Sequence, residues 1–133
     1  MISKETRLKN EKKEIEEAFE YDDMDDITHF APINGNLNHW LLRFNGRQGT
    51  DLYPGVYEVE MKMPDSYPAN FPDCKFRNDF KHYHIYQSGA ICLPLLKTGG
   101  WNATIKLIQL AKTIVNMVHS DPVIHDHADN TMK

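Results

Sequence analysis

The sequence predicts an α+β domain in which helices cover one face of a four-stranded antiparallel sheet. Apolar residues recur at helical spacing over residues 4–20 and again over residues 104–119, which predicts two helices. Four short runs of strand-like sequence lie between them and are separated by turn residues. Consecutive strands joined by short turns form a meander. The chain has 133 residues, the usual length of one domain, so we expect a single domain over residues 1–133.

The two predicted helices differ in how much apolar surface they carry. The first has a narrow apolar stripe that includes Leu8 and Ile15, so it should pack along one edge and expose the rest. The second is apolar over a broad face, and we expect it to form the core against the sheet. Asn102 or Thr104 can cap its start, and Pro122 follows its end.

The clearest strand covers residues 57–63, where apolar and charged residues alternate. This alternation is typical of a strand with one buried face and one solvated face. The other predicted strands cover residues 28–33, 40–44 and 75–77. Pro32 places the first of them at an edge of the sheet or near a strand end, because proline cannot donate a hydrogen bond to a neighbouring strand. Asn34 and Gly35 form a strong turn signal after it.

Composition excludes several classes of function. The net charge is −4, so there is no general reason to expect nucleic acid as a partner. No apolar run reaches the ~18 residues that a bilayer crossing needs, so no membrane partner is expected. The first residues lack the apolar core of a secretory signal. We therefore expect a cytoplasmic protein, or a nuclear one in a eukaryote, and its two cysteines should be free thiols.

Residues 82–101 fit neither a helix nor a strand, because glycine and proline punctuate them. Irregular segments on a rigid scaffold are where chemistry tends to lie. Histidines, tyrosines and a cysteine concentrate here: His82, Tyr83, His84, Tyr86 and Cys92. Cys74 lies instead in a short strand-like piece and is expected to be a packed thiol. Cys92 is therefore the candidate nucleophile.

Three groups of residues carry a resemblance to a known family. Tyr67-Pro68 with Pro72 is similar to a Tyr-Pro…Pro-Pro loop, and residues 88–93 are similar to the segment around an active cysteine. Trp101 follows at nearly the expected spacing. In this order, over nearly the whole chain, they resemble the ubiquitin-conjugating enzyme family. Motifs most similar to its SUMO-conjugating enzyme occur at residues 47–50, 74–76, 86–89 and 122–126.

This resemblance implies an activity and its residues. Cys92 would accept the C-terminus of ubiquitin or a ubiquitin-like modifier from an activating enzyme as a thioester. It would then pass the modifier to a substrate lysine, alone or with a ligase. Asp126 matches the acidic residue that orients and helps deprotonate that lysine, and Tyr86 matches a tyrosine that shapes its channel. The resemblance implies no cofactor. In the family the first helix docks the activating enzyme, and the cations on it here are Lys4, Arg7, Lys9, Lys12 and Lys13.

The sequence departs from the family pattern at three places. His82-Tyr83-His84 stands in place of His-Pro-Asn, so His84 occupies the asparagine position eight residues before Cys92. A neutral imidazole also donates one N–H, so His84 could stabilise the oxyanion or fix the loop. His82 is expected to be structural, bonded to backbone within its loop. Ala69 replaces a frequent aromatic ligase contact, and the chain ends at Lys133, where the family continues with two more helices.

Two other functions remain open at this point. His82, His84, His125 and His127 form two His-x-His pairs that could bind a metal together with Cys92, although their spacing fits no named zinc pattern. The second alternative is a catalytically inactive module of the same fold that binds a ubiquitin-like protein noncovalently. The altered His-Tyr-His motif is what suggests it.

Overall fold

The computed structural model describes residues 2–120, and the prediction of an α+β fold is confirmed there. Its elements are α1 (Lys4–Glu20), β1 (Ile27–Ile33), β2 (Asn36–Asn45), β3 (Val56–Lys62), β4 (Asp73–Phe76), a short 3-10 helix η1 (Pro94–Leu96) and α2 (Leu107–Ser120). The strands form one antiparallel sheet in the order β1-β2-β3-β4, which is the predicted meander. None of the helices within residues 2–120 combines the length and apolarity that crossing a membrane requires.

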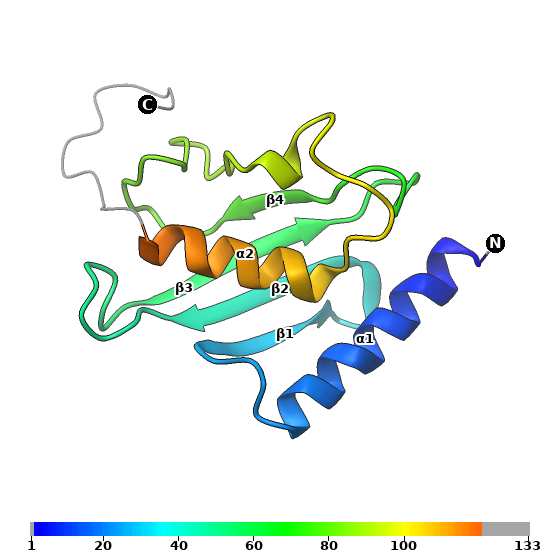
Figure 1. Cartoon of the computed structure of the whole chain (residues 1–133), viewed down its shortest axis with the longest axis horizontal. Helices are drawn as coiled ribbons and strands as arrows, with labels where there is room; N and C mark the ends of the chain where they lie inside the picture. The colour runs from blue at the N-terminus through cyan, green and yellow to red at the C-terminus, as the bar shows by residue number, and fades with distance from the viewer. Residues whose placement is uncertain (1, 121–133) are drawn as a thin grey trace.

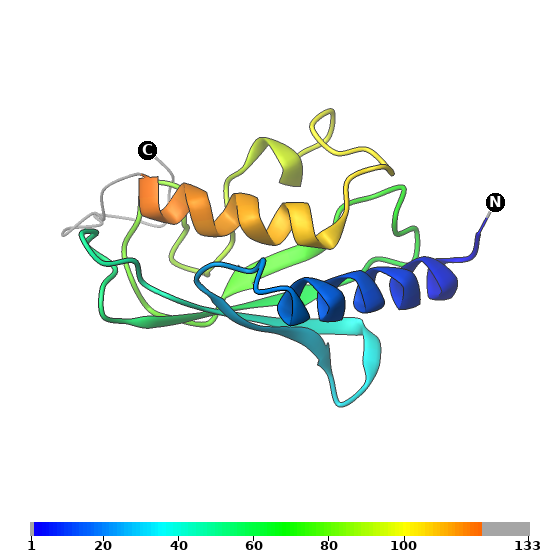
Figure 2. The ribbon, with the colours of Figure 1, turned by 60° about the horizontal axis from the view of Figure 1, so that its bottom comes forward.

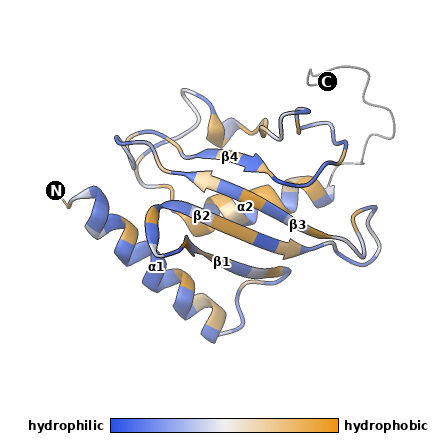
Figure 3. Cartoon of the chain, turned by 180° about the vertical axis from the view of Figure 1, so that it is seen from behind, coloured by the Kyte–Doolittle hydropathy of each residue, from blue (hydrophilic) through white to orange (hydrophobic). Residues whose placement is uncertain are grey.

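The sheet has one covered face and one open face. Figures 1 and 2 show α2 lying across one face, with α1 alongside β1. Figure 3 shows the opposite face, over which no helix of the described part lies. Along β3, Val59 and Met61 are buried under α2, while Glu58 and Glu60 point to the open face and bind Arg77. The predicted alternation of buried and solvated residues on this strand is therefore confirmed.

The hairpin that joins β1 to β2 is tighter than predicted. Asn34 and Gly35 both have positive φ, 53° and 74°, which is the geometry of a two-residue hairpin turn. Ile33 pairs directly with Asn36, so β2 begins at Asn36 rather than at residue 40. Pro32 lies on β1, an edge strand as predicted.

The core helix starts at Leu107, not at residue 104 as predicted. The reason is the side chain of Arg7, which donates hydrogen bonds to the carbonyl oxygens of Ala103 (2.7 Å) and Ile105 (2.9 Å). These contacts hold the segment before α2 in an irregular path along α1. Asn102 caps only a local turn, because its side-chain oxygen accepts the Thr104 N–H at 2.9 Å.

The actual caps of α2 come from other residues. Gln109 accepts the Lys106 N–H at 2.9 Å, as the third residue of a helix does in a capping box. Glu11 of α1 accepts the Leu107 N–H at 2.6 Å. The Glu11 carboxylate is 2% exposed, and it also accepts hydrogen bonds from Arg7 Nε (2.9 Å) and the Tyr67 hydroxyl (2.5 Å). One buried carboxylate thus joins α1, the Tyr67 loop and the start of α2.

Candidate functional site

Residues 84–92 form a narrow hairpin that brings His84, Tyr86 and Cys92 together. Its ends are closed by a hydrogen bond from the Cys92 N–H to the His84 carbonyl (2.8 Å). Its turn is closed by bonds from the Tyr86 N–H to Ala90 (2.9 Å) and from the Gly89 N–H to Tyr86 (2.9 Å). His84 and Cys92 are eight residues apart in sequence, yet their backbones are neighbours across this hairpin.

A glycine fixes the hairpin to β4. Gly89 has φ of 90°, a conformation that residues with a Cβ rarely adopt. Its carbonyl accepts the Phe76 N–H at 2.9 Å, and a Cβ on Gly89 would lie 2.4 Å from the Phe76 carbonyl oxygen. Only glycine allows this approach, so the hairpin that carries Cys92 is held by the edge of the rigid sheet.

The two cysteines lie in different environments, as the sequence predicted. Cys92 is half-buried, while its neighbours Ile91 and Leu93 point into the core and fix its position. Cys74 on β4 is buried, and this burial raises the pKa of its thiol well above the usual range. Because the thiolate is the reactive form, Cys74 is inert and Cys92 is the accessible thiol.

Lys97 lies beside Cys92, and sequence reasoning missed it. The nearby Cys92 side chain raises the pKa of Lys97 above its usual 10.5, with a smaller contribution from Tyr86. The turn of η1, closed by the Leu96 N–H on the Leu93 carbonyl (2.9 Å), brings Lys97 back toward the cysteine. Nothing in the sequence indicated this short 3-10 turn.

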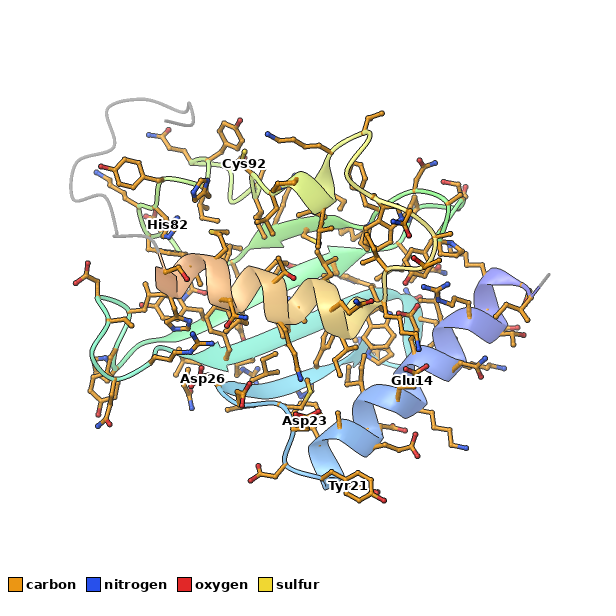
Figure 4. All side chains as sticks on the ribbon, viewed as in Figure 1. Glu14, Tyr21, Asp23, Asp26, His82 and Cys92 are labelled. Atoms are coloured by element: carbon orange, nitrogen blue, oxygen red, sulfur yellow. The ribbon has the colours of Figure 1, made fainter. Side chains whose placement is uncertain are left out.

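The two histidines of the His-Tyr-His motif differ in exposure. His82 is 0% exposed, and its Nδ1 accepts the His84 N–H at 3.1 Å. The predicted structural role of His82 within its loop is therefore confirmed. His84 is half-buried, with its ring centroid 5.8 Å from that of His82. Figure 4 shows Cys92 along the upper edge of the view and His82 farther to the left, both on the irregular stretch.

Some predicted site residues lie outside the described part of the chain. Asp126, His125 and His127 are among them, as is Pro122 after α2. Within residues 2–120, no group of three or more histidine, cysteine, aspartate or glutamate side chains is placed to hold a metal ion. Tyr86 is half-buried near Lys97.

The cations of α1 do not form one uniform surface. Lys9 and Lys13 are exposed, and Lys4 and Lys12 are half-exposed. Lys12 pairs with Glu16 at 2.8 Å on the helix surface. Arg7, which the sequence analysis grouped with these lysines, is only 16% exposed and bonds to Glu11 and the segment before α2. Arg7 lies on the face of α1 that packs against the segment before α2, and its side chain is therefore less exposed than those of Lys9 and Lys13.

Trp101 joins the segment before α2 to the loop before β4. The Trp101 indole N–H donates to the Pro68 carbonyl at 2.8 Å, and the Trp101 ring lies 6.2 Å from the Tyr67 ring. The residues that carried the resemblance at Tyr67-Pro68 and at Trp101 are thus in direct contact, although about 33 positions separate them.

Comparison with known proteins identifies the family. The family model described as ubiquitin-conjugating enzyme matches residues 7–133, so the chain belongs to the ubiquitin-conjugating enzyme family. A probable ubiquitin-conjugating enzyme of Arabidopsis thaliana is 29% identical over 99 residues, which cover 74% of this chain and 61% of that protein. A SUMO-conjugating enzyme of the same plant is 33% identical over 84 residues, 62% of this chain and 52% of that one. The aligned part thus spans only about half to three fifths of these relatives.

Solved structures agree with this family. A ubiquitin-conjugating enzyme from Plasmodium falciparum has a TM-score of 0.77 at 25% identity, over 90% of this chain and 86% of that one. Human ubiquitin-conjugating enzyme E2 G1 has a TM-score of 0.76 at 18% identity, over 86% of this chain and 93% of that one. At that identity the second likeness shows the fold alone.

Proposed function

We propose that this protein is an active conjugating enzyme in which Cys92 carries ubiquitin or a ubiquitin-like modifier as a thioester. The observation that supports this most directly is the placement of Cys92. It is half-buried on a hairpin anchored to β4, with the Lys97 side chain beside it. Such an electropositive and partly exposed position is typical of a reactive thiol.

The proposed reaction has two acyl transfers. The Cys92 thiolate attacks the carbonyl carbon of the thioester between the activating enzyme and the modifier, and the cysteine thiolate of the activating enzyme leaves. A substrate lysine amine then attacks the thioester on Cys92 and loses a proton, so that an amide forms and the Cys92 thiolate leaves. Tyr86 would line the approach of that lysine, and Asp126 would orient its amine.

The test of this function is a loading assay. The purified chain is incubated with activating enzyme, ATP and each of a panel of modifiers, including ubiquitin and SUMO, and run on a non-reducing gel. We expect one modifier to give a slower band that a thiol reductant removes. A protein that binds a modifier noncovalently, but gives no reductant-sensitive band with any activating enzyme, would be the inactive module instead.

The exposed lysines of α1 are proposed to dock the activating enzyme. Exposed charges mainly steer association, and salt screens them. The double reversal Lys9→Glu with Lys13→Glu should therefore slow loading at low ionic strength, by less at high salt, and leave the melting temperature unchanged. Glu17→Lys reverses one charge in the opposite sense at another exposed position of the same helix, and it should not slow loading. Equal loading rates for wild type and the double variant at low salt would exclude this docking surface.

His84 is proposed to contribute to discharge of the thioester. The His84 carbonyl binds the Cys92 N–H, so the residue lies across the hairpin from the reacting sulfur. Its imidazole offers one N–H when neutral and two when charged, and the charged form makes stronger hydrogen bonds to an oxyanion. His84→Ala should lower single-turnover discharge to free lysine by about 10²- to 10³-fold, the usual loss for one oxyanion donor. Loading should change less, because the cysteine is intact.

The pH profile separates this role from a structural one. Between about pH 6 and 9, the wild type should keep more of its discharge rate toward acid than His84→Asn, because an amide does not titrate. Superimposable profiles for the two proteins would remove any special role for the imidazole. Loading and discharge that fall together in His84→Ala, with a lower melting temperature, would show a structural role.

A further inference from the structure

In the last turn of α2, the His119 side chain contacts the segment that connects β2 to β3. Its Nδ1 lies 2.7 Å from the Val115 carbonyl oxygen, and its Nε2 lies 3.0 Å from the Arg47 backbone nitrogen. The ring packs edge-on against Phe44 of β2, with 5.7 Å between ring centroids. One half-buried histidine therefore joins three elements: α2, β2 and the β2–β3 connection.

These two hydrogen bonds determine the protonation of the ring. A carbonyl only accepts, so Nδ1 must carry a hydrogen and donate it to Val115. A backbone N–H only donates, so Nε2 must carry the lone pair that accepts it from Arg47. The neutral ring satisfies both contacts. The charged ring has a hydrogen on each nitrogen, so its Nε2–H would face the Arg47 N–H and that bond would be lost.

The charged groups around His119 come from each packed element. The Arg47 guanidinium donates to Asn116 of α2 at 2.6 Å and forms an ion pair with Asp26, which precedes β1 (Figure 4). Asp25 and Lys112 line the small hollow beside them. Burial lowers the pKa of His119 below its usual 6.5; the Val115 carbonyl raises it, Arg47 lowers it and Asp26 raises it. The surroundings thus favour the neutral ring on balance.

We propose that His119 is a pH-sensitive clamp that holds the β2–β3 connection to α2 when neutral and releases it when protonated. The lowered pKa fixes the direction of the effect. The clamp contributes its full stability above the unfolded-state pKa of about 6.5, and this contribution is lost as the pH falls through the lower folded-state pKa. The Arg47 backbone amide should lose the most protection on protonation, because its N–H donates the hydrogen bond that His119 Nε2 accepts. The proposal is independent of the activity of Cys92.

Two measurements on the full chain test the clamp. The first is NMR titration of the His119 ring, which should give a pKa below 6.5 and, near pH 7.5, a hydrogen on Nδ1 only. The second is hydrogen exchange at the Arg47 amide, corrected for the intrinsic pH dependence of exchange. Its protection should fall by about 2- to 10-fold as the pH falls from 7.5 through the His119 pKa that the titration gives, as expected for loss of one hydrogen bond.

Variants provide the controls. In His119→Gln the side-chain oxygen can accept the Arg47 N–H at any pH, so the pH dependence of protection should disappear. His29→Gln on β1 removes an imidazole that forms no side-chain hydrogen bond with residues 2–120, and it should leave that dependence unchanged. A His119 pKa at or above 6.5, or Arg47 protection that does not change with pH in the wild type, would overturn the proposal. These two readouts decide it even if His119→Gln folds poorly.

Discussion

Replacing Cys92 by alanine should abolish loading with the modifier, while replacing Cys74 by alanine should leave it intact. Cys92 is half-buried and Lys97 lies beside it, so its thiol is accessible to the modifier and next to a cation. Cys74 is buried, and its raised pKa leaves almost no thiolate at neutral pH. Cys92→Ser should give either no adduct or an oxyester that survives reductant. The measurement is the non-reducing gel, with mass spectrometry to locate the adduct.

The control for this prediction is folding. Cys74 lies on β4 among core residues, so Cys74→Ala leaves a small cavity and should lower the melting temperature somewhat. Loading must therefore be compared at a temperature where both variants are folded, as judged by circular dichroism. If loading were lost in folded Cys74→Ala but kept in Cys92→Ala, the thioester would form on Cys74 and its assignment to Cys92 would be wrong.

Replacing Glu11 by alanine should lower the free energy of unfolding by about 3–5 kcal/mol, the usual cost of removing one partner from a buried ion pair. The Glu11 carboxylate is 2% exposed and serves three donors: Arg7 Nε, the Tyr67 hydroxyl and the Leu107 N–H. The alanine variant leaves the Arg7 guanidinium, 16% exposed, without its carboxylate. It also removes a cap from α2. Urea unfolding followed by circular dichroism measures the change.

Two variants isolate the contribution of the buried charge. Glu16 lies on the same helix, and its carboxylate pairs with Lys12 on the surface. Glu16→Ala should therefore lower the free energy of unfolding by only about 0–1 kcal/mol, the usual contribution of an exposed ion pair. Glu11→Gln keeps the shape and the oxygen acceptor but not the charge, so its loss should lie between the two. If Glu11→Ala cost no more than Glu16→Ala, the three-way contact would contribute nothing measurable to stability.

Local periodicity explains which parts of the fold were predictable. The alternation along β3 and the broad apolar face of α2 follow from repeats of two and 3.6 residues, and both elements are where the sequence placed them. Element ends were less well predicted. α2 starts at Leu107 because Arg7 holds the carbonyl groups before it, and Arg7 is about 100 positions away in sequence. No local pattern could show that contact.

The same distinction applies to the candidate site. The sequence separated Cys92 from Cys74, because glycine and proline mark an irregular segment around the first and a strand-like pattern surrounds the second. It also placed His84 eight residues before Cys92. It did not show that their backbones are paired across a hairpin, nor that Gly89 is required for the hairpin to approach β4.

By itself, the sequence determined the α+β class, the meander of strands, the family and the choice of candidate cysteine, because each depends on local spacing or on short motifs. Only the tertiary structure decided that Arg7 turns inward, that Lys97 lies beside Cys92 and that His119 accepts a hydrogen bond from the Arg47 amide. These contacts depend on the path of the backbone between elements. Hydrogen-bonding groups that are distant in sequence must find partners when they are buried, and the identity of each partner is set by packing.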